Sequence, residues 1–583
     1  MQIKKESMHS CLASLFVQCI INPMPKKYLL ILLAIVVLGA FLRFYLITEI
    51  PLGLYPDEAM NGSNAQEAWA TGHFKVFYPE NNGREGLFIN LQAISLATFG
   101  PTPWALRIVS AVIGTLTILA IYLVAKEMFT KENVIPAQAG IQKRNTAWIP
   151  DQVGNDRMIG LLAAFFLATS YWHLNFSRIG FRAIMLPMMA CFGIYFLLKG
   201  LRRGKPYDLI LAGLFTGLGL YTYIAFRFMV FVFAMPVIAA IIKWRRERRA
   251  VAGEKSHCIP CSLALYVFVA VIAIIPIGLY FVQNPQDFLN RAGEVSVFAS
   301  ASPLKSFAKS VGLTLQMFFY HGDGNWRHNL AYAPELHPLV ALFFIIGIIM
   351  LMHRLKNYRL SAGTLFIWFA AMILPVALTR EGLPHALRAI GMIPPIIIIA
   401  GIGAERVRQW INIWVARQII KWPQKIAQLE RIRRELMIFF VLALMVIPLA
   451  TYRDYFLVWA NNPETYNAFD TGHLHLAQYL ASLPNDTKKY IIVNTLGTPV
   501  RGIPMPSQTI MYTTDTFTAE SRAAKNFSYL LRADADSINV AANQKTIITL
   551  LDETDRTLTK TLRQKFPILK IQVPGDFIVL QNY

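Results

Sequence analysis

Long apolar runs alternate with short polar clusters along the chain, and this pattern predicts helices that cross a membrane. The first run supplies about 20 residues, the length that an α-helix needs to span a hydrocarbon core of roughly 30 Å. Basic residues gather in short clusters between the runs, where they orient helices in a bilayer. The pattern predicts eleven spans. The second is entered at Arg107 and ends before the loop 127–157, and the others lie near residues 28–48, 158–174, 183–199, 208–224, 228–243, 263–282, 337–353, 362–379, 388–404 and 437–451.

The apolar run at residues 87–100 has about 14 residues, which is short for a span, and its placement sets the topology. If it crossed the bilayer, the basic clusters at 199–205 and 243–249 would both lie outside, against the positive-inside tendency. We therefore expect a helix that lies on the outer surface of the membrane. The amino terminus is then cytosolic, and the loop 49–104 is external.

The predicted fold class is an all-α polytopic membrane protein with a small extracytoplasmic α/β domain at its carboxyl end. Apolar character drops after Thr451, and about 130 residues follow, an ordinary size for a domain. The predicted parts are a cytosolic extension at 1–27, a transmembrane domain at 28–451 and the α/β domain at 452–583. Within the last of these, the pattern predicts a helix at 470–482 and strands at 489–494, 546–551 and 577–580.

Three connecting stretches have an unusual composition. In the cytosolic loop 127–157, residues 134–155 resemble the translation of a dispersed bacterial repeat, so we expect an insertion without a role in catalysis. Residues 405–436 carry eight Lys or Arg among apolar residues, which predicts a cytosolic surface helix. The external loop 284–336 contains a dense polar run at 320–329, which is either a solvated loop or a substrate lid.

Composition excludes an ordinary soluble protein, because 55% of the residues are hydrophobic and only 15% are charged, against about 25% in soluble domains. The net charge of +22 comes from the clusters that orient helices, so we expect membrane lipids and no nucleic acid as partners. Five cysteines predict no disulfide framework. The one close pair, Cys258 and Cys261, lacks the four ligands of a structural zinc site.

Two adjacent acids, Asp57 and Glu58 in the motif Pro56-Asp57-Glu58-Ala59, follow the first span. They are either part of a solvated loop or a catalytic acid pair at the membrane surface. No nucleotide sugars reach the outer face, so a sugar donor there is tethered to lipid, and its phosphate needs cations. External arginines supply candidates, and other external polar residues could contact substrate: Arg84, Glu85, Arg107, Arg178, Arg182, Tyr223, Arg227, His328, His385 and Arg388.

The order of four motifs resembles the GT-C superfamily of membrane glycosyltransferases. The motifs are Pro56-Asp57-Glu58-Ala59, Asn82-Gly83-Arg84-Glu85-Gly86-Leu87-Phe88, Trp104-Ala105-Leu106-Arg107 and Ser177-Arg178-Ile179-Gly180-Phe181-Arg182. The resemblance covers roughly residues 28–460 and is greatest to bacterial relatives of protein O-mannosyltransferases and of the lipid A aminoarabinose transferase.

The resemblance implies that a sugar moves, with inversion, from a polyprenyl-phosphate donor to a hydroxyl of a protein, glycan or lipid acceptor. The reaction would take place on the outer face of a bacterial plasma membrane. Asp57 matches the acidic residue of the family's first loop and would be the base, while Glu58 would orient the acceptor or the backbone. Arg107 matches a family arginine, and Arg178 or Arg182 would contact phosphate.

The chain also departs from its relatives. Many relatives have a His-Pro-Pro-Leu stretch where this chain has Arg84-Glu85-Gly86-Leu87, and residues 174–182 contain no carboxylate. The latter removes a two-carboxylate metal site, so we predict metal-independent catalysis without a cofactor.

Three alternatives remain at this stage. The first is a transporter or a flippase for lipid-linked saccharides, although transporters place ionisable residues at mid-membrane. The second is an O-antigen polymerase or ligase, and the third is a surface protein in which the carboxyl-terminal domain does the work.

Overall fold

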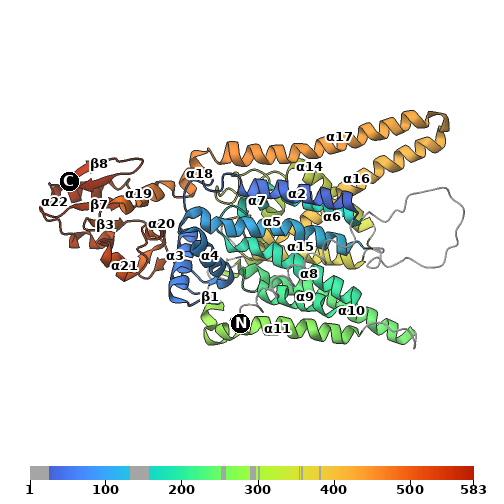
Figure 1. The fold of residues 1–583 in the computed structure, drawn as a ribbon, viewed down its shortest axis with the longest axis horizontal. Coiled ribbons are helices and arrows are strands. Elements are labelled where there is room, and N and C mark those ends of the chain that lie inside the picture. The colour runs from blue at the N-terminus through green and yellow to red at the C-terminus, as the bar shows by residue number, and fades with distance from the viewer. Residues whose placement is uncertain are drawn as a thin grey trace, which may run out of the picture.

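The structure, a computed structural model, describes residues 25–130, 156–250, 258–288, 297–299, 302–353, 355, 359–379 and 382–583. A bundle of long helices meets a small domain with a β-sheet at one end (Figure 1). We call this end of the bundle the domain end. The predicted insertion at 134–155 and most of the predicted extension at 1–27 lie outside the described residues.

Eight helical segments in the described ranges are long and apolar enough to cross a membrane. Three further predicted spans coincide with helices of 13, 14 and 16 residues, namely α6 (Asp156–Ala168), α9 (Pro206–Gly219) and α14 (Pro338–His353). Sixteen residues rise about 24 Å, less than the hydrocarbon thickness, so these three spans stay predictions. The eight segments contain α2 (Lys26–Phe44), α5 (Pro103–Met128), α8 (Met185–Arg203), α10 (Met229–Ala250), α11 (Ile259–Gln283), α15 (Arg359–Ala377), α16 (Ile393–Lys421) and α17 (Ile426–Tyr452).

The prediction of a separate surface helix at 405–436 is wrong. The helix α16 continues to Lys421, a short 3-10 turn (Pro423–Lys425) follows, and α17 begins at Ile426. The two helices form a hairpin that projects from the bundle away from the domain end (Figure 1). Arg, Lys, Glu and Gln are good helix formers, so the polar stretch extends the two apolar helices instead of forming a third.

The first loop folds over the domain end as two helices and a short hairpin. Its elements are α3 (Pro56–Thr71), β1 (Phe77–Tyr78), β2 (Arg84–Glu85) and α4 (Gly86–Phe99). The last of these is the predicted short helix. Pro56 occupies the first turn of α3 and Gly72 ends the helix in the left-handed region with φ 72°, so the local sequence sets both ends.

The carboxyl-terminal domain is α/β, as predicted. Its five-stranded sheet has the order β6-β3-β7-β9-β8, in which β3 pairs in parallel with β6 and β7, and β9 pairs antiparallel with β7 and β8. The predicted helix and strands are all present. The bounds are α19 (Thr471–Ser482), β3 (Lys488–Val493), β6 (Phe527–Leu531), β7 (Thr546–Leu550), α22 (Arg556–Lys565), β8 (Lys570–Gln572) and β9 (Val579–Gln581).

Shorter elements connect these parts. A disulfide joins Cys258 and Cys261 at the start of α11, a bond that the number of cysteines did not predict. A seven-residue π-helix (Arg453–Trp459) extends α17 toward the carboxyl-terminal domain. The remaining short elements are α7 (Tyr171–Phe176), α13 (Pro303–Gln316), α18 (Pro463–Ala468), β4 (Pro499–Val500), β5 (Ile503–Pro504), α20 (Gln508–Thr513) and α21 (Ala519–Ala524).

The helix α3 lies between the bundle and the carboxyl-terminal domain (Figure 1). The hydroxyl of Thr509 in α20 donates to the carbonyl of Leu54 at 2.8 Å. Gly62 of α3 faces the ring of Tyr512 so closely that an added Cβ would lie 2.4 Å from a ring carbon. Arg501 reaches across to Glu67 and Glu80, at 2.7 and 2.9 Å. The helix that carries the acidic motif is therefore held from both sides.

Candidate active site

The acidic motif forms the first turn of α3, where Asp57 and Glu58 enter different surroundings. Successive residues of a helix point about 100° apart, so neighbours in the sequence need not share an environment. Asp57 is partly exposed, and its Oδ1 accepts a hydrogen bond of 2.5 Å from the amide of Asn81. The unpaired backbone N–H groups of a first helical turn favour negative charge at this position.

Glu58 is completely buried and all its contacts are within the protein. Its two carboxylate oxygens accept from Nε and Nη2 of Arg107, both at 3.0 Å, and Oε1 also accepts from the backbone N–H of Gly180 at 2.6 Å. Arg107 donates further to the carbonyls of Pro51 and Gly53, both at 2.6 Å. This pair therefore fastens α3 to α5 and to the turn at 177–182.

Three of the predicted arginine ligands are buried, with their donors directed to protein acceptors. Besides Arg107, Arg84 donates to the side-chain carbonyls of Asn61 and Asn64. Arg178 donates to three backbone carbonyls at 2.8 to 3.1 Å, those of Leu42, Arg43 and Ile50. Burial lowers the pKa of Arg84 to about 10. These side chains join segments of the fold, which leaves few donors for a substrate.

A second set of predicted residues, which we call the Arg182 cluster, contains two partly exposed arginines and two buried residues: Arg182, Arg227, Glu85 and Tyr223. Nε of Arg182 lies 2.8 Å from Glu85 Oε2, and the guanidinium lies over the ring of Tyr223. Arg227 stacks on Phe288, 4.0 Å from the ring centroid, and donates to the carbonyl of the same residue at 3.0 Å. The charge of Glu85 also acts on Arg227, so this carboxylate faces two cations.

The loop 317–337 between α13 and α14, which we call the second loop, reaches the acidic motif through a residue that the sequence did not single out. The guanidinium of Arg327 lies 3.9 Å from the ring centroid of Tyr55, two residues before Asp57. Burial, together with the charge of Asp57, raises the pKa of Tyr55 to about 12. The backbone carbonyl of Arg327 accepts from the amide of Asn175, which ties the loop to α7.

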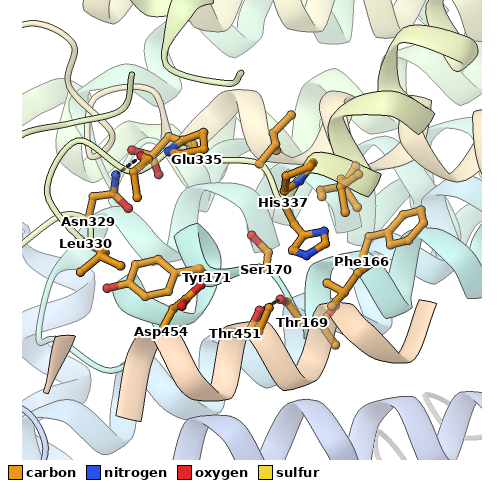
Figure 2. A pocket seen from close by; sticks show the side chains of 18 residues that line it. Phe166, Thr169, Ser170, Tyr171, Asn329, Leu330, Glu335, His337, Thr451 and Asp454 are labelled. Atoms are coloured by element: carbon orange, nitrogen blue, oxygen red, sulfur yellow. Dashed lines mark hydrogen bonds between the residues drawn. The ribbon is translucent and has the colours of Figure 1, made fainter. Parts of the chain in front are cut away.

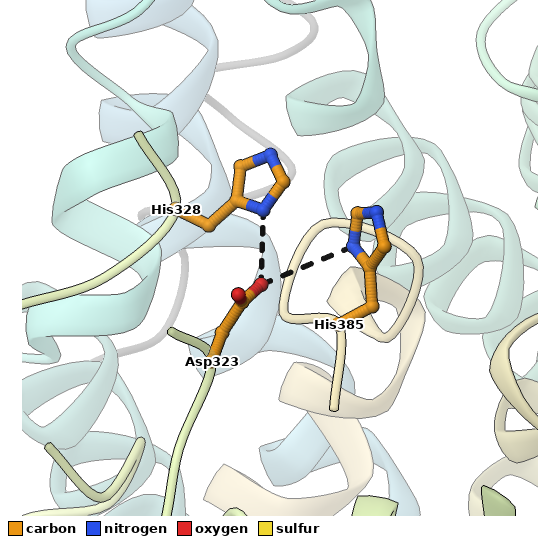
Figure 3. Close-up of side chains that lie close together, drawn as sticks. All are labelled: Asp323, His328 and His385. Carbon is orange, nitrogen blue, oxygen red and sulfur yellow. Dashed lines mark hydrogen bonds and ion pairs between the residues drawn. The ribbon is translucent and has the colours of Figure 1, made fainter. Parts of the chain in front are cut away.

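The predicted residues His328 and His385 lie side by side, although 57 positions separate them in the sequence. Their rings stack with centroids 4.8 Å apart, and each turns Nδ1 toward the carboxylate of Asp323 (Figure 3). Burial lowers the pKa of His328, and the hydrogen bond with Asp323 opposes that shift. Asp323 lies within the polar run at 320–329, and that run was the only signal for it in the sequence.

The predicted residue Arg388 lies in the turn between α15 and α16. It donates to Thr379 Oγ1 at 2.8 Å.

A small cavity of about 120 Å³ lies between the second loop, α7 and α17 (Figure 2). Its wall includes Glu335 and Tyr171, each with a buried oxygen that has no hydrogen-bond partner in the described structure. Burial raises the pKa of Glu335 well above its ordinary range, and the charge of Asp323 adds to the shift. Ligand sites usually enclose about 300–1,000 Å³, so this cavity suits a few water molecules and not a lipid-linked sugar.

A protein-family model and several solved structures match this chain, and both kinds of match agree with a helical membrane fold. The family model of dolichyl-phosphate-mannose-protein mannosyltransferases matches residues 153–274, from the predicted insertion into α11. A search of curated protein sequences finds no match.

Solved structures similar to this chain include two of ArnT from Cupriavidus metallidurans. One is bound to undecaprenyl phosphate and the other is in the apo state; they are 15% and 14% identical to this chain, each with a TM-score of 0.51. The alignments cover 96% of this chain and 99% and 98% of ArnT. The Archaeoglobus fulgidus oligosaccharyltransferase tethered with an acceptor peptide has 13% identity and a TM-score of 0.49, and the match covers 93% of this chain and 68% of that one.

The similarity to ArnT runs through the helical bundle and the carboxyl-terminal domain alike. The predicted helical membrane fold with a carboxyl-terminal α/β domain and the predicted resemblance to GT-C proteins are thus confirmed, while the side of the membrane on which the domain lies stays a prediction. The chain is a polytopic helical membrane protein with the fold of the GT-C glycosyltransferases.

Proposed function

We propose that the protein transfers a sugar from a polyprenyl-phosphate donor to an acceptor hydroxyl on the outer face of a bacterial plasma membrane. The ArnT fold supports this proposal, since one ArnT structure holds undecaprenyl phosphate. The match of residues 153–274 to the mannosyltransferase family supports it further. The amino terminus is then cytosolic, and the domain 452–583 is extracytoplasmic.

The observation that carries the proposal is the separation of Asp57 from Glu58. Glu58 is buried and occupied by Arg107 and Gly180, whereas Asp57 is partly exposed and held by one neutral amide, that of Asn81. A general base must reach the proton that it removes, so Asp57 is the member of the pair suited to that role.

In the reaction that we propose, Asp57 takes the proton of the acceptor hydroxyl as its oxygen attacks the anomeric carbon. The bond from that carbon to the donor phosphate breaks, and polyprenyl phosphate leaves with the bonding electrons. Attack opposite the leaving group inverts the configuration at the anomeric carbon. The reaction needs no change of oxidation state and no cofactor.

The leaving phosphate needs cations, and we assign Arg182 and Arg227 of the Arg182 cluster to it. They are less buried than Arg84, Arg107 and Arg178, and they share a single carboxylate, so their combined charge is positive. A charge-assisted contact of this kind is worth about 1.5–3 kcal/mol. Arg388, on the turn before α16, is a third candidate.

Asp57→Asn tests the proposal in a deletion strain complemented with each variant, by mass spectrometry of surface glycoconjugates. We expect normal expression and a transfer rate about 10²- to 10⁴-fold below that of the wild type, the usual contribution of a general base. Glu49→Gln is the matched control, because Glu49 is an exposed carboxylate in the same loop. Full transfer by Asp57→Asn would contradict the proposal. A flippase would continue to translocate a saccharide lipid in proteoliposomes with this substitution.

A further inference from the structure

We propose that Asp323, His328 and His385 form a binding site for a divalent transition-metal ion of the zinc type. Each of the three residues offers one ligand atom, and these atoms lie within 4.8 Å of one another. Nδ1 of His328 is 2.9 Å and Nδ1 of His385 is 4.0 Å from the same oxygen of Asp323. Figure 3 shows the two imidazoles converging on this carboxylate from two separate loops.

These distances are close to those of a metal site. Ligand atoms that lie about 2.0–2.2 Å from a tetrahedral zinc ion are about 3.4 Å apart. The contact of His328 is shorter than this value, that of His385 is longer, and all the ligand atoms lie within 4.8 Å of one another, so shifts of about 1 Å would place them around one ion. Two imidazoles and one carboxylate suit zinc and similar ions, whereas magnesium and calcium prefer oxygen ligands.

The backbone around the cluster already orients the carboxylate, as outer partners do in metal sites. The N–H of Ala386 donates to Asp323 Oδ2 at 2.8 Å, and the N–H of Asn325 donates to Oδ1 at 2.8 Å. The carbonyl of Ala386 in turn accepts from the indole of Trp172 at 3.1 Å. The carboxylate and the loop that carries His385 are therefore fixed before an ion binds.

The charges near the cluster do not attract a cation. Those of Arg327 and Arg388 act on His328, and Glu335 accepts a hydrogen bond from the N–H of Asp323. No net negative field attracts a cation here, so the coordinating nitrogen and oxygen atoms must hold the ion. This condition favours an ion that binds imidazole strongly over one held by charge alone.

The ion would fasten the second loop to the turn before α16. The second loop also carries Arg327, which stacks on Tyr55 beside the acidic motif. Binding of the ion is independent of the proposed sugar transfer, and it is compatible with metal-independent chemistry at Asp57. We expect the bound ion to make the loops at the domain end more ordered.

Metal analysis of the full-length chain in detergent tests this site. The protein is stripped with EDTA, incubated with Zn²⁺ and desalted, and the bound metal is measured by mass spectrometry. We expect about one ion per wild-type chain, and a loss of affinity of about ten-fold or more in Asp323→Asn, His328→Gln and His385→Gln. His321→Gln is the matched control, because His321 is an exposed histidine of the same loop.

A titration with Co²⁺ gives a readout that needs no variant. Visible absorption of tetrahedral or five-coordinate cobalt should saturate at one equivalent in the stripped wild-type chain and be displaced by Zn²⁺. Size-exclusion chromatography checks that each variant is folded. The proposal is overturned if the folded wild type binds no more metal than His385→Gln, or if the three cluster variants retain metal as His321→Gln does.

Discussion

Two of the arginine–glutamate pairs at the domain end, Arg107–Glu58 and Arg182–Glu85, differ in how far their arginine is exposed. The pair of Arg107 and Glu58 is buried, with side chains 2% and 0% exposed, and carbonyls and a backbone N–H complete its hydrogen bonds. The pair of Arg182 and Glu85 keeps 13% of its arginine exposed and has a second cation beside it. The same residue types therefore join buried segments in one place and keep a partly exposed guanidinium in the other.

The difference also separates two neighbours in one motif. Glu58 points into the bundle and Asp57 toward the loop, because consecutive helical positions diverge. A buried pair that loses one partner leaves an uncompensated charge, whereas a partly exposed pair leaves a charge that water can solvate. Substitutions in the two pairs should therefore differ in how strongly they lower stability relative to sugar transfer.

The largest effect is expected from Arg107→Ala. It leaves Glu58 buried without a partner, and breaking a buried pair in this way costs about 3–5 kcal/mol. Thermal unfolding in detergent should show a lower midpoint, with reduced expression. The double variant Arg107→Met with Glu58→Leu should recover much of the loss. If Arg107→Ala instead kept its stability and lost only sugar transfer, Arg107 would be the substrate ligand that its motif implies.

A smaller and different effect is expected from Arg182→Ala. The Glu85 side chain is only 4% exposed and loses this partner, so the midpoint of thermal unfolding should fall, but less than in Arg107→Ala, because the Arg182 side chain is 13% exposed. Transfer should fall by about ten- to thirty-fold, since a charge-assisted contact to phosphate is worth about 2 kcal/mol. Arg453→Ala is a control, because Arg453 is more exposed and pairs with its sequence neighbour Asp454. Unchanged transfer by Arg182→Ala at limiting donor would remove it from the phosphate site.

The smallest effect is expected from Arg501→Ala. Its pairs with Glu67 and Glu80 are about one-third exposed, so the loss should be about 0.5–1 kcal/mol. Limited proteolysis should detect faster cleavage between the bundle and the carboxyl-terminal domain. Arg532→Ala serves for comparison, since its pair with Asp555 lies inside that domain. Equal cleavage of the two variants would mean that Arg501 does not help to hold the domains together.

Local rules predicted the helices and strands well, because their signals lie within a few residues. Pro56 and Gly72 mark the two ends of α3, and the β-strands at 488–493 and 546–550 fall within a residue of their predicted bounds. The stretch at 405–436 was predicted wrongly, because its charges read equally well as a separate surface helix or as the ends of two long ones. Only the packing of the hairpin distinguishes these two arrangements.

The sequence predicted many residues of the candidate site, but it did not predict which of them are in contact. The sequence indicated His328 and His385 separately, but not Asp323, which joins them, nor Asn81, which binds Asp57. Arg327 was missed for the same reason, since its partner Tyr55 belongs to another loop. Residues that meet through loops leave no periodic pattern, so no local rule detects them.

The sequence by itself determined that the chain is a polytopic membrane protein, and it identified Asp57 and the arginines as candidates. Apolar runs and basic clusters carry that information, because the hydrophobic effect and the cost of moving charge across a bilayer act on each segment separately. Only the tertiary structure decided which candidates are buried. Arg107 meets Glu58 across 49 positions, and Arg178 meets the carbonyl of Leu42 across 136. Burial and pairing depend on such distant contacts. The charge of a residue can therefore be predicted from the sequence, whereas its solvent accessibility cannot.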